Sequence, residues 1–157
     1  MDKRMVLLLV ASMGVSALYG YKQADYDKAM DLNNVGQLTL IKADLTKANL
    51  TGANLRRAYL YGTDFTGADL TGAILIHATL PKATLTNANL TGANLNVARL
   101  TDAILTGANL TDAILINADF TDAIFTDAIL DGARCDADTV FSETAPYKCV
   151  DGKVVKK

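Results

Sequence analysis

Few residues of this chain have side chains that commonly carry out chemistry. The 157 residues include one histidine, His77, and two cysteines, Cys135 and Cys149, with no tryptophan. No Cys-His pair, zinc-ligand spacing or glycine-rich phosphate loop is present in the sequence. His77 stands without a neighbouring nucleophile that it could activate. We therefore predict a protein that is not an enzyme and that holds no cofactor and no metal.

The N-terminal residues have the order of a secretory signal peptide. Lys3 and Arg4 precede a charge-free stretch over residues 5–21, and Val15 and Ala17 suit a cleavage site after Ala17. We expect a signal peptide over residues 1–17. The alternative is an uncleaved anchor that reaches to about residue 21, which approaches the shortest span of a bilayer. Both predict that the remaining chain is exported, to a bacterial periplasm or a thylakoid lumen, and both limit membrane contact to this segment.

The composition of the whole chain is strongly biased. Alanine, leucine, threonine and aspartate number 24, 22, 17 and 16 residues, and the formal net charge is only −2. Half of the residues are hydrophobic, which is unlike a disordered chain. A bias of this kind in an apolar chain indicates an internal repeat.

The repeat has a period of five residues. From Leu40 to Leu130 every fifth residue is Leu or Phe, at 19 positions without exception. Alanine stands two residues before the next centre from Ala43 to Ala133, and only Thr63 departs from this rule. The centre is usually followed by Thr, and the next position is Gly, Asn or Asp in 13 of 19 units.

A five-residue period fits neither a helix nor a continuous strand. Five residues advance a helix by about 140°, and an odd period places successive leucines on opposite sides of a strand. The period is consistent with a chain that turns a corner in each unit. Thr-Gly then forms the middle of a β-turn, and Pro81 takes its first central position. Four corners of about 90° make a square coil of 20 residues.

The units resemble those of the pentapeptide repeat family. Ala-Asn-Leu-Thr-Gly occurs at 48–52 and 88–92, and Ala-Asp-Leu-Thr-Gly occurs at 68–72. The resemblance implies an all-β fold, a right-handed quadrilateral parallel β-helix of about five coils over residues 38–134. In such a helix the central residue and the preceding alanine face inward. We expect the Thr63 hydroxyl to bond to nearby backbone inside the tube.

Each end of such a tube requires a cap, because its backbone lacks a neighbouring coil. Residues 18–37 are expected to form the N-terminal cap, with a short helix over residues 25–34. Residues 135–157 are expected to form the C-terminal cap and tail. Cys135 occupies a central position of the repeat, and a disulfide to Cys149 would hold the tail across the last coil. The alternative is two reduced cysteines or a redox switch.

Two sets of outward residues are candidates for an interaction surface. One set is apolar and concentrated in the C-terminal half: Ile104, Ile114, Ile116, Ile124 and Ile129. The other combines basic and aromatic side chains around one corner: Arg56, Arg57, Tyr59 and Tyr61. The alternative for both sets is ordinary exposed strand surface. Threonine ladders at the corners are expected to support stacking rather than to bind ice.

The acidic residues raise a further hypothesis. Between residues 100 and 133 there are six Asp and no Lys or Arg. This half is similar to family members that mimic DNA and bind gyrase, although its aspartates fall on several faces. We predict a non-enzymatic scaffold or protein-interaction module that binds an unknown protein, or itself as a homodimer, and no nucleic acid. A DNA-mimicking gyrase binder is the first alternative, and a metal-binding or enzymatic tail is the second.

Overall fold

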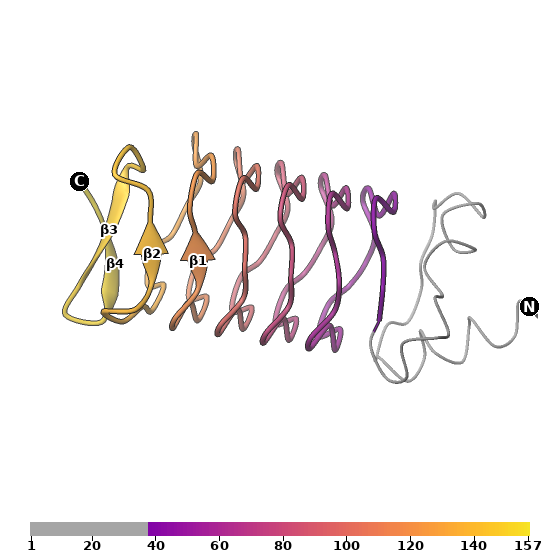
Figure 1. The fold of residues 1–157 in the computed structure, drawn as a ribbon, viewed down its shortest axis with the longest axis horizontal. Helices are drawn as coiled ribbons and strands as arrows, with labels where there is room; N and C mark the ends of the chain where they lie inside the picture. The colour runs from indigo at the N-terminus through magenta and orange to yellow at the C-terminus, as the bar shows by residue number, and fades with distance from the viewer. Residues whose placement is uncertain (1–37) are drawn as a thin grey trace, which may run out of the picture.

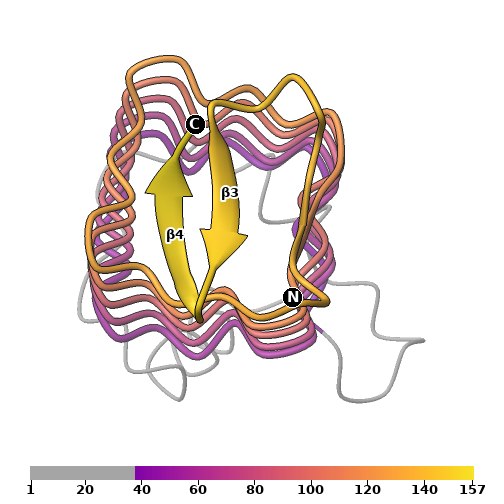
Figure 2. The ribbon, with the colours of Figure 1, turned by 90° about the vertical axis from the view of Figure 1, so that its left-hand side faces the viewer.

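The computed structural model describes residues 38–157, which form a tube of stacked coils. The coils follow one another along a single axis from residue 38 to the C-terminal end (Figure 1). Viewed along that axis, each coil is a square whose sides and corners superimpose on those of the next coil (Figure 2). The predicted signal peptide and N-terminal capping helix lie outside the described residues.

Parallel bridges between residues twenty apart hold the coils together. Thr39 bridges Tyr59, and Tyr59 bridges Thr79, in the same register that recurs on all four sides of the square. Each bridge is flanked by backbone hydrogen bonds of 2.6–3.0 Å, such as Leu90 N–H to the Asn109 carbonyl at 2.6 Å. Each side contributes only one short extended piece per coil, so the strands are short. The turns between these pieces determine the square shape of the coil.

A turn closes every unit of the repeat. The N–H of Ala83 donates to the carbonyl of Leu80 at 3.1 Å, with Pro81 and Lys82 as the two central residues. The second central residue has a positive φ, near 57° at Lys82 and 65° at Gly52. Positive φ at this position alone is characteristic of type II turns, and it explains why Gly, Asn and Asp are common there.

The interior is filled by the two inward positions of each unit. The central Leu or Phe is buried from Leu45 to Leu130, and so is the preceding position from Ala43 to Ala133. Alanine leaves room for the larger leucines in a narrow tube, so both types are needed for close packing. Thr63 is fully buried, and its hydroxyl donates to the Leu40 carbonyl, which confirms the predicted backbone bond.

The C-terminal end departs from the twenty-residue register. Strand β1 (Asp119–Phe120) pairs in parallel with β2 (Val140–Phe141), 21 residues later. Phe120 and Phe141 stack with ring centroids 5.4 Å apart, and Phe125 contacts the Tyr147 ring at 5.7 Å. These aromatic rings fill the last layer of the core, where no further coil supplies leucines.

An antiparallel hairpin lies across this end of the tube (Figure 2). It consists of β3 (Tyr147–Val150) and β4 (Lys153–Lys156). Val154 N–H in β4 donates to the Ala133 carbonyl of the last coil at 3.0 Å. The hairpin therefore both covers the aromatic layer and pairs with the edge of the last coil. No helix among residues 38–157 is long and apolar enough to cross a membrane.

Candidate interaction surface

Three positions of each unit remain on the outside, and their side chains are partly used by the fold. At several units an Asp or Asn oxygen accepts hydrogen bonds from both the N–H and the hydroxyl of the Thr two residues later. Asp69 accepts these bonds from Thr71 at 3.0 and 2.6 Å. The Thr71 hydroxyl and N–H together lower the pKa of Asp69 below its usual value. These polar residues stabilise the turns within each coil, whereas the sequence predicted a role for the threonine ladders in stacking between coils.

The same motif occurs at Asp119, beside the acidic end of the tube. Its partial burial alone would raise the pKa of Asp119. The hydroxyl and N–H of Thr121, at 2.6 and 2.9 Å, oppose that effect, and the net result is a lowered pKa. The charge of Arg99 on the preceding coil acts in the same direction.

The five candidate isoleucines do not form one patch. Ile104 and Ile124 bridge each other on one side, with 36 and 50% of their surface exposed. Ile129 follows on the adjacent side and is 47% exposed. Ile114 and Ile116 lie half a coil from Ile104, on the opposite side, and are only partly exposed. The structure therefore places Ile104, Ile124 and Ile129 near one another and separates the other two.

The basic and aromatic candidates lie at the opposite end of the described tube. Arg56 and Arg57 are exposed at one corner, Tyr59 is 44% exposed on the next side, and Tyr61 is 38% exposed at the following corner. The four residues therefore wrap around one side of an early coil. They present two cations and two phenol groups.

The six aspartates of the C-terminal half are spread around the tube. Asp102 and Asp122 share one corner column, Asp119 lies on a side, and Asp112, Asp127 and Asp131 lie at two other corners. No group of three or more His, Cys, Asp or Glu among residues 38–157 is placed to hold a metal ion. The carboxylates are thus distributed over several faces, as the sequence predicts, instead of forming one acidic stripe.

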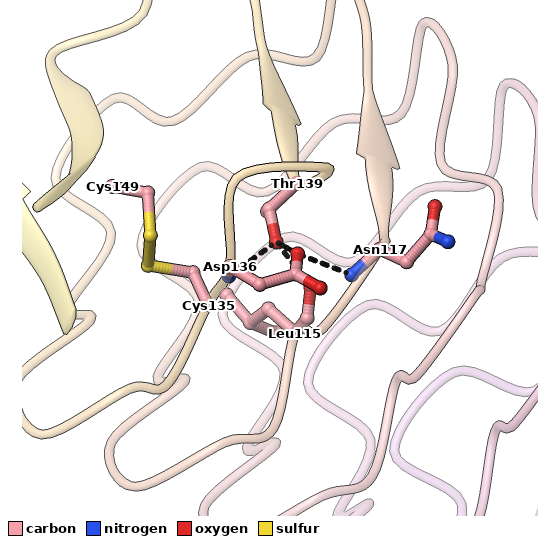
Figure 3. Close-up of a disulfide and its surroundings, with 6 residues drawn as sticks. All are labelled: Leu115, Asn117, Cys135, Asp136, Thr139 and Cys149. Carbon is pink, nitrogen blue, oxygen red and sulfur yellow. Dashed lines mark hydrogen bonds between the residues drawn. A yellow bond between two sulfur atoms is a disulfide. The ribbon is translucent and has the colours of Figure 1, made fainter. Parts of the chain in front are cut away.

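The tail contains a polar cluster that the sequence did not reveal (Figure 3). Cys135 and Cys149 form the predicted disulfide, with an S–S distance of 2.03 Å. Next to it, the Asp136 carboxylate accepts hydrogen bonds from Asn117 N–H at 2.9 Å and from the Thr139 hydroxyl at 2.8 Å. The Asn117 N–H, followed by the Thr139 hydroxyl, lowers the pKa of Asp136. In regular coils a backbone carbonyl accepts the equivalent bond, so only the altered register gives Asp136 this role.

The repeats identify the family of the chain. The sequence profile described as "Pentapeptide repeats" matches residues 39–75, 75–107 and 103–134, in 8 copies. The chain belongs to the pentapeptide repeat family. The right-handed β-helix that this family implies agrees with the parallel coils of the structure. A comparison with curated proteins finds no match.

Solved structures of pentapeptide repeat proteins are similar to the chain. One is from the thylakoid lumen of Arabidopsis thaliana, with a TM-score of 0.64, 25% identity and coverage of 88% of this chain and 94% of that one. Rfr23 from the cyanobacterium Cyanothece 51142 has a TM-score of 0.40 and 28% identity, covering 66% of this chain and 91% of that one. QnrB1, a plasmid-mediated fluoroquinolone resistance protein, has a TM-score of 0.36 and 18% identity, covering 64% of this chain and 53% of that one.

Proposed function

We propose that this pentapeptide repeat protein is an exported, non-enzymatic scaffold whose outer faces bind another protein. Its family consists generally of structural or interaction modules. The tube interior is filled by alanine and leucine side chains, so binding would use the outside.

The stacked pair Ile104 and Ile124, with Ile129 beside it, is the observation that supports this function best. These side chains are 36–50% exposed, at positions where earlier coils carry Asp, Thr or Asn. The repeat itself does not require an apolar residue there, because Asp64 and Thr84 occupy the same column. Exposed apolar side chains that lie near one another on a polar surface are typical of protein contact sites. We therefore assign the partner surface to these three residues, with Arg56, Arg57, Tyr59 and Tyr61 as a second candidate and Ile114 and Ile116 as a third.

Export is supported by two independent features. The N-terminal residues have the order of a signal peptide, and the tail holds a disulfide, which persists in oxidising compartments. The similar Arabidopsis protein is from the thylakoid lumen. We propose a thylakoid lumen or a bacterial periplasm as the location of this chain.

The alternatives receive less support from the same surface. A DNA-mimicking gyrase binder would require an extended acidic stripe, whereas the aspartates occupy several sides and corners. A metal site built on thiolates is not available in the tail, because both cysteines are joined in the disulfide. Within the described part of the chain, residues 38–157, no group of three or more His, Cys, Asp or Glu is placed to bind a metal through other ligands. No observation supports either alternative more strongly than it supports the scaffold.

Affinity capture from the compartment that contains the protein tests the scaffold function. We expect a partner to be captured by the natural chain and lost with Ile124→Lys, which places a charge in the apolar patch. Asn49→Lys is the control, since it introduces the same charge at the same position of a unit four coils away from Ile129. If Ile124→Lys and Asn49→Lys retain the same proteins as the natural chain, the assignment of the partner surface is wrong.

A further inference from the structure

One corner of the tube carries a column of charged residues that changes sign along the axis. Each corner residue donates its N–H to the next coil: Lys42 to Tyr61, Gly62 to Pro81, Lys82 to Thr101 and Asp102 to Thr121. The N–H of Asp122 continues the series to the Ser142 hydroxyl. We call Lys42, Gly62, Lys82, Asp102 and Asp122 the corner column. Its first half is basic, its second half is acidic, and Glu143 follows at the acidic end.

The charged side chains of this column are available for contact. Lys42, Lys82, Asp102, Asp122 and Glu143 are all exposed. Within residues 38–157 no ion pair joins any of them to another residue of the chain. Opposite charges in a row on a rigid support offer a surface that a complementary row of charges would match.

We propose that this surface binds a second copy of the chain side by side and antiparallel, as a two-fold symmetric dimer. The two-fold axis passes between Lys82 and Asp102 and is perpendicular to the tube. It relates the corner column of one copy to the same column of the second copy, running in the opposite direction. Lys82 then lies opposite Asp102 of the second copy, and the same contact occurs twice. Further pairs of corner residues follow on both sides of this central contact, about 4.8 Å apart along the tube for each coil. A parallel dimer would instead place like charges together.

The position of Lys42 strengthens the match at the outer coils. A β-carbon built on Gly62 would lie 3.4 Å from Cγ of Lys42, so the Lys42 stem leans over Gly62. The coil of Gly62 is the one that meets Asp122 of the second copy under the same symmetry. Glycine at position 62 thus leaves room for Lys42 to reach a carboxylate of the opposing chain.

Of the two sides that adjoin the corner column, the one that precedes it in the chain is compatible with this pairing. It presents Tyr59, Thr79, Arg99 and Asp119 in successive coils. The symmetry places Tyr59 opposite Asp119 of the second copy, and Thr79 opposite Arg99 of the second copy. A phenol can donate to a carboxylate, and a guanidinium can donate to a hydroxyl, so these contacts require no like-charge pair.

Another corner offers a rival column, but it carries fewer charges. Lys47 and Asp127 stand at the two ends of that corner, with Gly67, Asn87 and Gly107 between them. A two-fold axis at the Asn87 coil would therefore bring opposite charges together only at the outermost coils. The Lys47 corner therefore serves as the control surface.

The antiparallel dimer deepens the proposed interaction role. It rests on that proposal only because both use an outer face of the tube for binding. The test is sedimentation equilibrium of the full chain at about 0.01 M and about 1 M ionic strength, where the Debye lengths are about 30 and 3 Å. We expect a dimer at low ionic strength that dissociates at high ionic strength. Lys82→Asp and Asp102→Lys should each weaken association about tenfold or more, because each creates like-charge contacts across the axis. The double variant should restore it.

Mixing the two single variants separates this dimer from effects within one chain. Each variant alone repels itself, but a mixed pair places Asp at 82 opposite Lys at 102 and the two natural partners opposite each other. We expect the mixture to associate as well as the natural chain. Lys47→Asp, the control, should leave association unchanged, and thermal unfolding of every variant should show an intact tube.

Three outcomes would overturn the antiparallel dimer: a monomer at low ionic strength, a dimer unaffected by Lys82→Asp, or a mixture that does not associate better than its components. None of these outcomes bears on capture of another protein through Ile124. Conversely, loss of that capture would leave the dimer intact, so failure of either idea can be recognised separately.

Discussion

The second central residue of each turn is the position where side-chain type conflicts most with the backbone. All such residues from Lys42 to Gly132 have positive φ, whether or not they are glycine. Asn87 and Asn117 adopt it at 55°, and asparagine tolerates this region well. Val97 adopts it at 57°, although a β-branched side chain is rare there. Val97 is 38% exposed, so burial of its side chain offsets little of this backbone strain.

Replacing Val97 should therefore stabilise the tube. We expect Val97→Asn to raise the free energy of unfolding by about 1 kcal/mol, since a strained backbone of this type costs about 1–3 kcal/mol. Urea or guanidinium unfolding measures the change. The reverse substitution at the equivalent turn position of the opposite corner, Asn87→Val, should be destabilising by a similar amount. Equal stability of Val97→Asn and the natural chain would contradict the strain at Val97.

At the scale of elements, the tail is held to the last coil by both covalent and hydrogen bonds. The disulfide joins Cys135 of the coil to Cys149 of β3. Cys135 N–H donates to the Gly152 carbonyl at 3.1 Å, and the Tyr147 hydroxyl donates to the Ala128 carbonyl. The hairpin covers an aromatic layer that would otherwise meet water, so its attachment contributes to the stability of the last coils.

Removing the disulfide should weaken this attachment measurably. Because the cysteines are 14 positions apart in the sequence, we expect Cys135→Ala with Cys149→Ala to lower the free energy of unfolding by about 3 kcal/mol. Chemical unfolding of the oxidised natural chain and of the double variant gives the difference. Addition of a thiol reductant should destabilise the natural chain and leave the double variant unaffected. A reductant effect of the same size on both would show that the disulfide is not its cause.

For the whole molecule, several aspartates are hydrogen-bonded most strongly when ionised. Asp69, Asp119 and Asp136 have lowered pKa values in the folded chain. A lowered folded pKa contributes stability above the unfolded pKa, about 3.9 for Asp, and this contribution is lost as the pH falls through the folded pKa. The carboxylates lie on different coils, so their contributions combine in the unfolding of one continuous tube.

We therefore expect stability that is nearly constant from about pH 7 to about pH 5 and that falls below about pH 4. Asp69→Asn should reduce the acid loss, because Asn89 and Asn109 already occupy the same column and accept the same Thr bonds. Asn109→Asp should increase it. The free energy of unfolding measured across this pH range tests both changes, and identical acid profiles for the three chains would contradict the argument.

Much of the tube was predictable because one rule is repeated at 19 positions. The inward Ala and Leu, the turn at Thr-Gly, the bond of Thr63 and the pairing of Cys135 with Cys149 agree with the sequence-based predictions. The role of Asp136 was not predictable, since it depends on the extra residue between β1 and β2 that breaks the register. Chains without a local period give no such signal.

The sequence by itself determined the fold of this protein, because Ala and Leu recur with a five-residue period that fits neither a helix nor a continuous strand. The 20-residue coil also predicts which outer residues stack, such as Ile124 on Ile104. Only the tertiary structure decided how far these side chains are exposed, and how the last coil leaves that register, with Val140 paired to Asp119. The physical reason is that exposure and the closing of the tube depend on packing between distant residues, such as the aromatic rings of the last layer.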